Sequence, residues 1–195
     1  MYRMKKHLII GNPISHSLSP KLHNYWFKQN NIDATYEKAQ PREVEIKEIL
    51  NKIKSGEIWG INVTVPFKKK VIPFIEKLSE TAKETSSVNT IFKKEDSIYG
   101  DNTDVRGFEL SLKYENCELS NKKAFILGAG GVVPSIIKAL KNLNIKQIFL
   151  SNRTIKNSDY ITKQFPEIII VEWGQVPDFD IIINATSPGL NKDDH

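Results

Sequence analysis

The chain has 195 residues, of which 39% are hydrophobic, and its 28 Lys and Arg outnumber 23 Asp and Glu to give a net charge of +5. This size and composition are enough for a hydrophobic core in one large domain or two small ones. A single cysteine, Cys117, excludes an internal disulfide and is typical of a reducing compartment, so we expect a cytoplasmic protein. The opening MYRMKKHLII has too short an apolar run for a signal peptide or a membrane span.

The first hundred residues alternate between short apolar runs and stretches with helical periodicity. This pattern predicts strands at residues 7–10, 35–39 and 58–65 and helices at residues 20–30 and 44–54. The first helix has Leu22, Tyr25, Trp26 and Gln29 on one side, and the first three form an apolar stripe. Lysines and glutamates are interspersed along the second helix, which is typical of a solvated face and argues against nucleic-acid binding.

Polar turn residues at 101–107 precede a new pattern, so we expect a domain boundary there, with domains at residues 1–103 and 104–195. Later strands are predicted at 124–127, 147–150, 168–171 and 181–184, with helices between them. Strands that alternate with helices indicate an α/β fold with parallel sheets and helices on both faces.

The stretch KKAFILGAGGVVPSIIKAL predicts a strand, a glycine turn and a helix. Gly128 permits the tight turn, and Gly130 lets the backbone approach a pyrophosphate at the start of the helix. Val133 departs from the small residue that such dinucleotide sites prefer, and Pro134 is acceptable in the first helical turn. An ordinary packing turn is the alternative to cofactor binding.

The end of the next predicted strand, IFLSNRT, indicates which dinucleotide binds. An NAD site has an acidic residue at this position for the ribose 2′-hydroxyl, and none is present here. Arg153, between Asn152 and Thr154, is suited to a 2′-phosphate because its guanidinium makes paired N–H bonds. We therefore expect NADP, with a merely solvated arginine as the alternative.

Polar side chains in the first half suggest a site for a hydroxyl-bearing redox substrate. Thr64 lies at the end of a predicted strand and Lys68 just past it, Asn89 lies on a short strand, and Asp104 begins the second domain. A lysine beside an aspartate can donate a proton to a carbonyl oxygen as hydride arrives, or accept it in the reverse direction. Taken singly, each of these residues is equally typical of a surface or a turn.

Seven motifs occur in order, namely GNPISHSLSP, NVTVPFK, SVNTI, GDNTDVRGF, GAGG, SNRT and NATSPGL. Together they resemble the shikimate dehydrogenase family over nearly the whole chain. The resemblance implies NADPH-dependent reduction of 3-dehydroshikimate to shikimate in aromatic amino-acid (chorismate) biosynthesis. It also implies an N-terminal α/β substrate domain joined to a Rossmann-like NADP-binding domain.

The resemblance also implies roles for individual residues. Lys68 and Asp104 match the catalytic residues. The substrate-binding positions are Ser17, Ser19, Thr64, Lys68, Asn89 and Asp104, with the two serines on the shikimate carboxylate. The cofactor-binding positions are Gly128, Ala129, Gly130, Gly131, Val132, Asn152, Arg153, Thr154, Glu80 and Thr186. Ser19, followed by Pro20, is also expected to cap its helix, whereas Lys69 and Lys70 are expected to be exposed.

The chain also departs from the family pattern. GAGGVV replaces a loop in which alanines are usual, and family members continue well past NATSPGL, whereas this chain stops at His195. We therefore expect the NADP-binding domain to be incomplete at its C-terminal end. A non-catalytic remnant that binds shikimate or a nucleotide, or a quinate-using relative, are the alternative functions. We expect no metal and no membrane or nucleic-acid partner, and the sequence does not indicate the oligomeric state.

Overall fold

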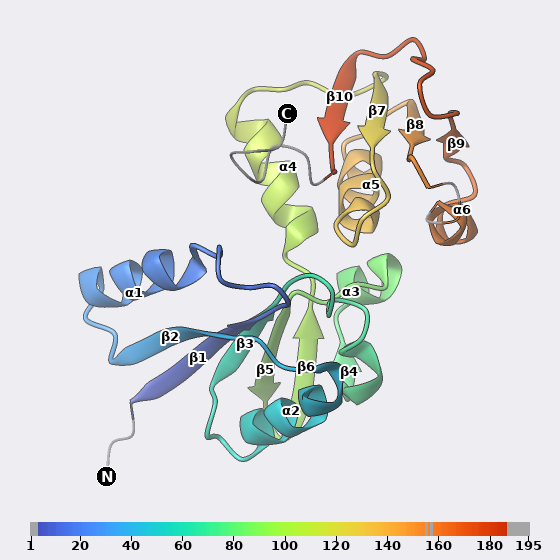
Figure 1. Ribbon diagram of the computed structural model, residues 1–195. Coiled ribbons are helices and arrows are strands. Elements are labelled where there is room, and N and C mark those ends of the chain that lie inside the picture. Colours follow the sequence, from blue (N-terminus) through green and yellow to red (C-terminus); the bar gives the residue numbers. More distant parts are fainter. Residues whose placement is uncertain (1–3, 155, 157, 187–195) are drawn as a thin grey trace. The chain divides into compact units, whose positions relative to one another are not determined.

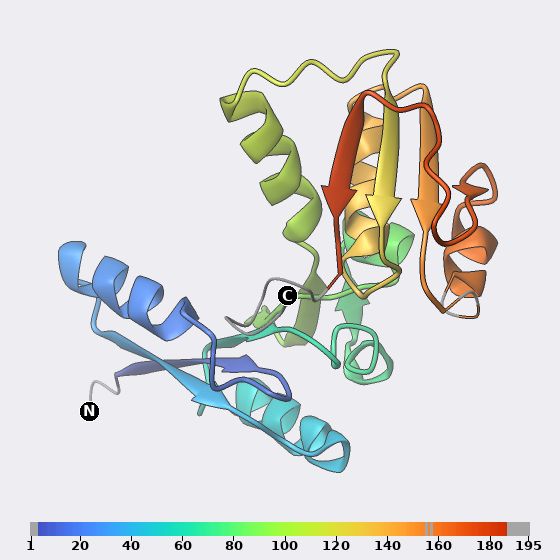
Figure 2. The same cartoon turned by 45° about the horizontal axis from the view of Figure 1, so that its top comes forward.

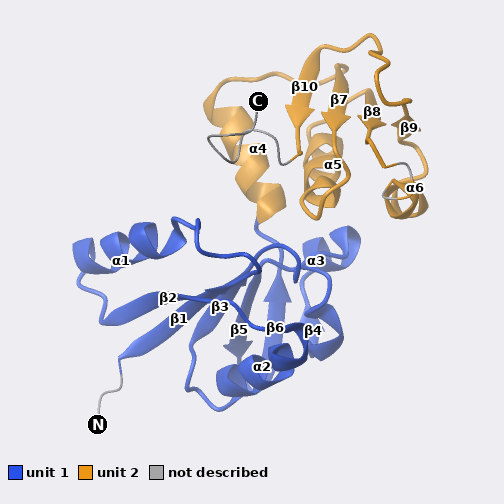
Figure 3. Cartoon of the chain, in the orientation of Figure 1, with its two compact units in different colours: residues 1–103 blue, residues 104–195 orange. Residues whose placement is uncertain are grey.

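The computed structural model describes residues 4–154, 156 and 158–186. The chain forms two compact units, Met1–Thr103 and Asp104–His195 (Figures 1 and 3). Each unit has its own sheet and its own apolar core, so the α/β fold class expected from the sequence is confirmed. Among the helices described, none is both long and apolar enough to cross a membrane.

Unit 1 contains a six-stranded mixed sheet in the order β2-β1-β3-β5-β6-β4. The strands are β1 (Lys5–Ile10), β2 (Ala34–Ala39), β3 (Gly60–Val63), β4 (Lys77–Leu78), β5 (Thr90–Lys94) and β6 (Ser97–Asp101). The helices are α1 (Ser19–Gln29), α2 (Ile46–Lys54) and α3 (Glu80–Thr85), with 3-10 turns η1 (Glu43–Glu45) and η2 (Ile72–Phe74).

Strand β5 breaks the parallel arrangement predicted for this sheet. β1 pairs in parallel with β2 and β3, but β5 runs antiparallel to both β3 and β6. Only two residues separate Lys94 from Ser97, and one of them, Glu95, has a φ of +55°. Such a short connection can join only antiparallel strands, because a parallel pair needs a long crossover.

The two faces of the unit 1 sheet are covered by different helices, as Figure 2 shows for α1 and α2. Side chains alternate between the faces along each strand. One set packs with α2 in the main core and includes Leu8, Ile10, Ile61, Val63 and Ile91. On the opposite face, Ile9 and Tyr36 cluster with Phe27 of α1. Unit 1 therefore has helices on both faces of its sheet, as predicted.

Helix α1 differs from the expectation based on its apolar stripe. Leu22, Tyr25 and Trp26 are each about half exposed, at 47%, 58% and 47%, and no residue of the helix is fully buried. The helix instead faces β2 with a more polar side, on which the Asn24 amide donates to Tyr36 O and accepts from Tyr36 N, both at 2.9 Å. Because β2 is an edge strand, its outer backbone groups require such partners.

Unit 2 contains a four-stranded parallel sheet in the order β10-β7-β8-β9. Its elements are α4 (Asp104–Tyr114), β7 (Lys123–Leu127), α5 (Val133–Asn142), β8 (Gln147–Ser151), α6 (Asp159–Gln164), β9 (Ile169–Ile170) and β10 (Ile181–Asn184). Helices α4, α5 and α6 contribute side chains to one core cluster, which includes Ala124 and Ile126 of β7. The first strand of the unit, β7, is therefore central, with the later strands added on both sides of it.

Candidate active site

Four segments of unit 1 meet at one edge of its sheet, where β1, β3 and β6 end and β5 begins. Backbone bonds join these segments directly. Thr64 N–H donates to Ile10 O at 2.9 Å, Val63 N–H to Asn89 O at 2.8 Å, and Asn89 N–H to Asp101 O at 3.0 Å. Thr64 and Asn89, which are distant in the sequence, therefore lie on adjacent segments of one edge.

The loop after β1 passes very close to the loop after β3. A Cβ atom on Gly11 would lie 2.5 Å from Thr64 Cγ2 and 3.1 Å from Val65 O, so only glycine fits. Asn12 N–H donates to Val65 O at 3.0 Å, and the Asn12–Pro13 and Val65–Pro66 peptides are both cis. The loop that leads to the two serines therefore leaves the sheet against the Thr64 loop.

The serines at the start of α1 differ from expectation in how they interact with the helix start. Ser19 is the first residue of the helix and does not cap it, since the cap position is Leu18 and no side chain bonds there. The Ser17 hydroxyl instead accepts a hydrogen bond from Ser19 N–H at 3.3 Å. The prediction that Ser19 caps the helix is wrong, because the helix begins one residue earlier than Pro20 indicated.

Lys68 lies in the loop that follows β3 and is half-buried. Its backbone is held by two neighbours, since Phe67 is only 3% exposed and Val88 N–H donates to Lys68 O at 2.9 Å. Lys70 is exposed, as predicted, and pairs with Glu43 at 2.5 Å. Lys69 was expected to be exposed but is half-buried, and this burial lowers its pKa.

The Asn89 side chain has a dense set of partners. Its Oδ1 accepts from Thr90 Oγ1 at 3.0 Å and from Thr103 N–H at 3.0 Å, and its Nδ2 donates to Thr103 Oγ1 at 2.9 Å. Asn62, which the sequence analysis missed, donates to Asn89 O at 3.2 Å. The signal that could have revealed Asn62 is its position two residues before Thr64, on an otherwise apolar strand.

The remaining predicted residues near this part of the chain differ in their surroundings. Asp104 follows Thr103 directly and is the half-buried first residue of α4. Glu80 is the first residue of α3, where its exposed carboxylate pairs with Lys83 at 2.7 Å. Glu80 is thus engaged within its own helix.

In unit 2 the glycine turn joins the end of β7 to the start of α5. Gly128 has a φ of +102°, and a Cβ there would lie 2.8 Å from Ala185 O. A Cβ on Gly131, by contrast, would meet no atom within 4 Å. Helix α5 has no side chain capping its first turn. Open space beside glycine amides and an uncapped helix start are the features that accept a pyrophosphate.

Tyr160 of α6 contacts the backbone of this turn, and sequence reasoning did not identify it. Its hydroxyl lies 2.9 Å from Ala129 O and 3.0 Å from Gly130 O, so its single proton is shared between two carbonyl acceptors, and burial raises its pKa to about 12. A phenol with this pKa remains protonated near neutral pH and so remains a donor. No local pattern marks this residue, because it lies 30 positions after Gly130.

The ends of β8 and β10 lie at the same edge as the glycine turn, since both strands run parallel to β7. After β8, Asn152 Nδ2 donates to Thr154 O at 2.7 Å, which shapes a turn that leaves Arg153 exposed. After β10, Thr186 N–H and Oγ1 donate to Asn184 Oδ1 at 3.0 and 2.5 Å. An exposed guanidinium beside a glycine turn, without an acid at the strand end, fits a dinucleotide with a 2′-phosphate.

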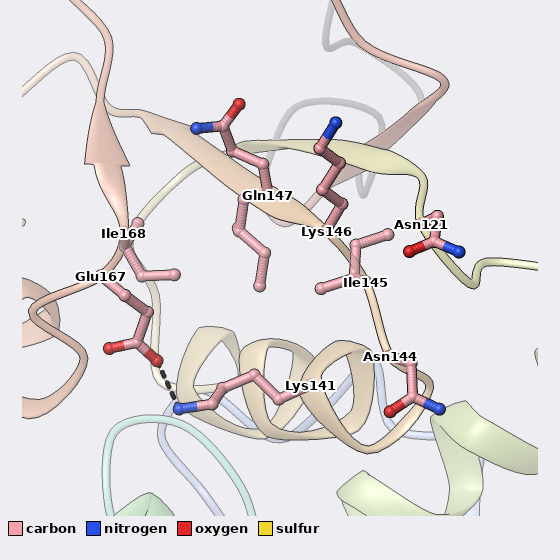
Figure 4. A pocket seen from close by; sticks show the side chains of 9 residues that line it. Asn121, Lys141, Asn144, Ile145, Lys146, Gln147, Glu167 and Ile168 are labelled. Carbon is pink, nitrogen blue, oxygen red and sulfur yellow. Dashed lines mark hydrogen bonds and ion pairs between the residues drawn. The ribbon is translucent and has the colours of Figure 1, made fainter.

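A cavity of about 450 Å³ lies elsewhere in unit 2, where β8 begins (Figure 4). Lys141 and Glu167 form an ion pair at its side, and Asn144 and Gln147 also line it. This is the amino end of β8, whereas Arg153 and the glycine turn are at the carboxyl end of the sheet. The cavity is therefore not part of the predicted cofactor site.

The strand order of unit 2, with a glycine turn after its central strand, defines a Rossmann-type dinucleotide-binding unit. Comparisons with known proteins agree with this assignment. Residues 9–91 match the family model for the shikimate dehydrogenase substrate-binding domain, and residues 109–190 match the model for shikimate / quinate 5-dehydrogenase. The chain belongs to the shikimate dehydrogenase family, as its motifs suggested.

The similarity to individual relatives extends over most of this chain. Shikimate dehydrogenase (NADP(+)) of Pelagibacter ubique is 56% identical over 97% of this chain and 72% of its own. The crystal structure of shikimate dehydrogenase from Aquifex aeolicus is similar with 34% identity and a TM-score of 0.89, over 100% of this chain and 74% of that one. A shikimate 5-dehydrogenase of Thermus thermophilus in complex with NADP(H) and shikimate has 26% identity and a TM-score of 0.84, over 94% of this chain and 69% of that one.

Proposed function

We propose that this chain catalyses the reversible, NADPH-dependent reduction of 3-dehydroshikimate to shikimate, a step of aromatic amino-acid biosynthesis. The observation that carries the proposal is the match of both units to shikimate dehydrogenase models, with 56% identity to a shikimate dehydrogenase (NADP(+)). Supporting it, the unit 1 edge gathers Thr64 and Asn89 on adjacent segments, and unit 2 presents a glycine turn and Arg153.

We assign a different binding function to each of the two units. We assign shikimate binding to residues 1–103 and cofactor binding to residues 104–195. In unit 1, Ser17 and Ser19 bind the shikimate carboxylate, since hydroxyl donors at a helix start favour an anion. Thr64, Asn89 and Asp104 are assigned to the ring hydroxyls, as the family resemblance implies.

Lys68 is the proposed acid and base. During reduction its ammonium gives a proton to the carbonyl oxygen, which becomes the new hydroxyl, and in the reverse direction its amine takes that proton back. Asp104 orients the ammonium or the substrate hydroxyl. The backbone of Lys68, held between buried Phe67 and Val88, supports a fixed location for this side chain.

The cofactor, NADPH, supplies the hydride for the carbonyl carbon. Its pyrophosphate would be held by the turn from Gly128 to Val132 at the start of α5, and its 2′-phosphate by Asn152, Arg153 and Thr154. Thr186 lies at the same sheet edge, whereas the pairing of Glu80 with Lys83 makes Glu80 the weakest of the assigned contacts.

The test is an assay of NADP+ reduction by shikimate, with quinate as a second substrate and calorimetry for binding. We expect turnover with shikimate and a smaller kcat/KM for quinate. Lys68→Met should bind shikimate nearly normally but lose turnover by about 10²–10⁴-fold, whereas Lys70→Met, which removes an exposed lysine two residues before the 3-10 turn η2, should be unaffected. Binding of shikimate without any turnover would favour the non-catalytic alternative, and loss of affinity alone in Lys68→Met would refute the acid/base role.

The proposal also includes the binding partner and the cellular compartment. The partner is a small molecule, because relatives have been crystallised with shikimate and NADP(H). We place the protein in the cytoplasm, in keeping with its single cysteine, Cys117. Fractionation of the cells that produce it tests this placement, and recovery of the protein outside the cytoplasm would refute it.

A further inference from the structure

A chain of side-chain hydrogen bonds crosses one face of the unit 1 sheet and ends at Asn89. The Tyr36 hydroxyl donates to Asn62 Oδ1 at 2.6 Å, and Asn62 Nδ2 donates to Thr90 Oγ1 at 3.1 Å. The Thr90 hydroxyl then donates to Asn89 Oδ1 at 3.0 Å. Three strands contribute these groups, since Tyr36 lies on β2, Asn62 on β3 and Thr90 on β5.

Strand register brings these groups together. Asn62 and Thr90 are directly opposed across the antiparallel pair β3–β5, so their side chains share a face. Tyr36 is aligned with His7 and, through it, with Gly60. Asn62 lies two residues after Gly60 on β3, so its side chain is on the same face of the sheet as that of Tyr36.

The chemistry of the groups determines the direction of the chain. A phenol has one proton to donate, and Tyr36, only 4% exposed, gives it to Asn62 Oδ1. The Asn62 amide must then turn its NH₂ toward Thr90. The Thr90 hydroxyl, having accepted this bond, has its single proton left for Asn89 Oδ1.

An asparagine amide can present either its oxygen or its NH₂ to a ligand, and the two ends have nearly the same shape. Here the amide oxygen of Asn89 accepts hydrogen bonds from the Thr90 hydroxyl, from Thr103 N–H and, at 3.2 Å, from Thr103 Oγ1. The NH₂ group of Asn89 is directed toward Thr103 Oγ1, at the exposed end of the network. The preceding bonds therefore determine which end of Asn89 meets a ligand.

We propose that Thr90 is a positioning residue for the shikimate site, which sets the Asn89 amide so that its NH₂ donates to a ring hydroxyl of the substrate. Asn62 and Tyr36 impose the direction on Thr90. This inference rests on the proposed function, because it takes Asn89 to be a substrate contact. Thr90 itself does not touch substrate.

The experiment compares Thr90→Val, which keeps the shape but removes the hydroxyl, with Thr90→Ser, which keeps the hydroxyl. Thr90→Val should raise the KM and calorimetric Kd for shikimate by about 3- to 10-fold, the value of one neutral hydrogen bond, and leave the KM for NADP+ unchanged. Thr90→Ser should restore shikimate binding to within about 2-fold of the parent, well inside the value of one such bond. Thr35→Val, on β2 and outside the chain of bonds, is the matched control.

A second readout is independent of the proposed function. In ¹⁵N NMR spectra, the side-chain amide signals of Asn89, assigned by their loss in Asn89→Asp, should shift in Thr90→Val and return in Thr90→Ser. Unchanged Asn89 signals in Thr90→Val would overturn the positioning role whether or not the protein binds shikimate. Shifted signals with unchanged shikimate affinity would overturn the link to the substrate, while a parent that does not bind shikimate at all would refute the proposed function instead.

Discussion

The imidazole of His23 lies flat against the ring of Tyr36, with ring centroids 4.2 Å apart and only 2° between the planes. His23 belongs to α1 and Tyr36 to β2, so this stack is part of the packing between helix and sheet. A second histidine, His7, contacts Phe27 of α1 with centroids 5.4 Å apart. Desolvation by burial is the main cause that lowers the pKa of both histidines.

These histidines make the stability of unit 1 depend on pH. Their folded-state pKa values lie below the ordinary value of 6.5, so the unfolded chain binds more protons as the pH falls below 6.5. Their contribution to stability is therefore complete above pH 6.5 and is lost progressively below it. We expect the urea midpoint to fall between about pH 6.5 and pH 5, a range in which ordinary carboxylates remain mostly ionised.

Variants identify the source of this pH dependence. His23→Phe keeps an aromatic ring against Tyr36 without a titrating group, so its midpoint should vary less over this range than that of the parent. His16→Gln removes an exposed histidine and should leave the curve unchanged. A parent-like pH dependence in His23→Phe would contradict the assignment to His23.

Substitution by alanine should have different effects at two glycines of the turn after β7, lowering stability at one and NADP binding at the other. Gly128→Ala should lower the free energy of unfolding by about 1–3 kcal/mol, because its φ of +102° disfavours a side chain and its Cβ would meet Ala185 O. Gly131→Ala should leave stability nearly unchanged, since its Cβ meets no protein atom, but should weaken NADP binding by filling the cofactor's space. Urea unfolding and calorimetry measure the two effects, and equal loss of stability in both variants would refute this distinction.

Arg153 should determine the choice between NADP and NAD. Arg153→Ala removes an exposed guanidinium after β8 and should weaken NADP binding by about 1.5–3 kcal/mol while leaving NAD binding nearly unchanged. Lys163→Ala, an exposed cation of α6, serves as the control and should affect neither cofactor. If Arg153→Ala weakens both cofactors equally, the guanidinium does not contact the 2′-phosphate.

Substitutions of Ser17 and Ser19 at the start of α1 should separate effects on shikimate binding from effects on stability. Ser17→Ala should raise the KM for shikimate and also cost about 0.5–1.5 kcal/mol, because it removes the acceptor for Ser19 N–H. Ser19→Ala should raise the KM with little loss of stability, since Ser19 does not cap the helix. Ser15→Ala, in the same loop and exposed, is the control. A large loss of stability in Ser19→Ala would restore the capping role.

Much of the molecule was predictable from local sequence. The strands β7, β8 and β10 lie within a residue of their expected bounds, because an apolar run between turn residues is a local signal. The glycine turn was predictable for the same reason, since its constraint acts within a few residues. The motifs also identified the family, which the comparisons confirm.

Other features depend on pairing between distant segments. The α1 stripe of Leu22, Tyr25 and Trp26 has helical periodicity, but periodicity cannot tell which side of a helix meets the sheet. The antiparallel course of β5 and β6 follows from a two-residue connection whose significance appears only once the strands are paired.

The sequence by itself determined the α/β class, because strand and helix patterns alternate along the chain. It also determined the glycine turn, the arginine after β8 and the polar residues of unit 1, because each of these is a property of one short segment. Only the tertiary structure decided that Tyr160 supports the glycine turn and that Tyr36, Asn62 and Thr90 lead to Asn89. The physical reason is that hydrogen bonds between side chains depend on strand register and packing, which bring together residues that no local pattern connects.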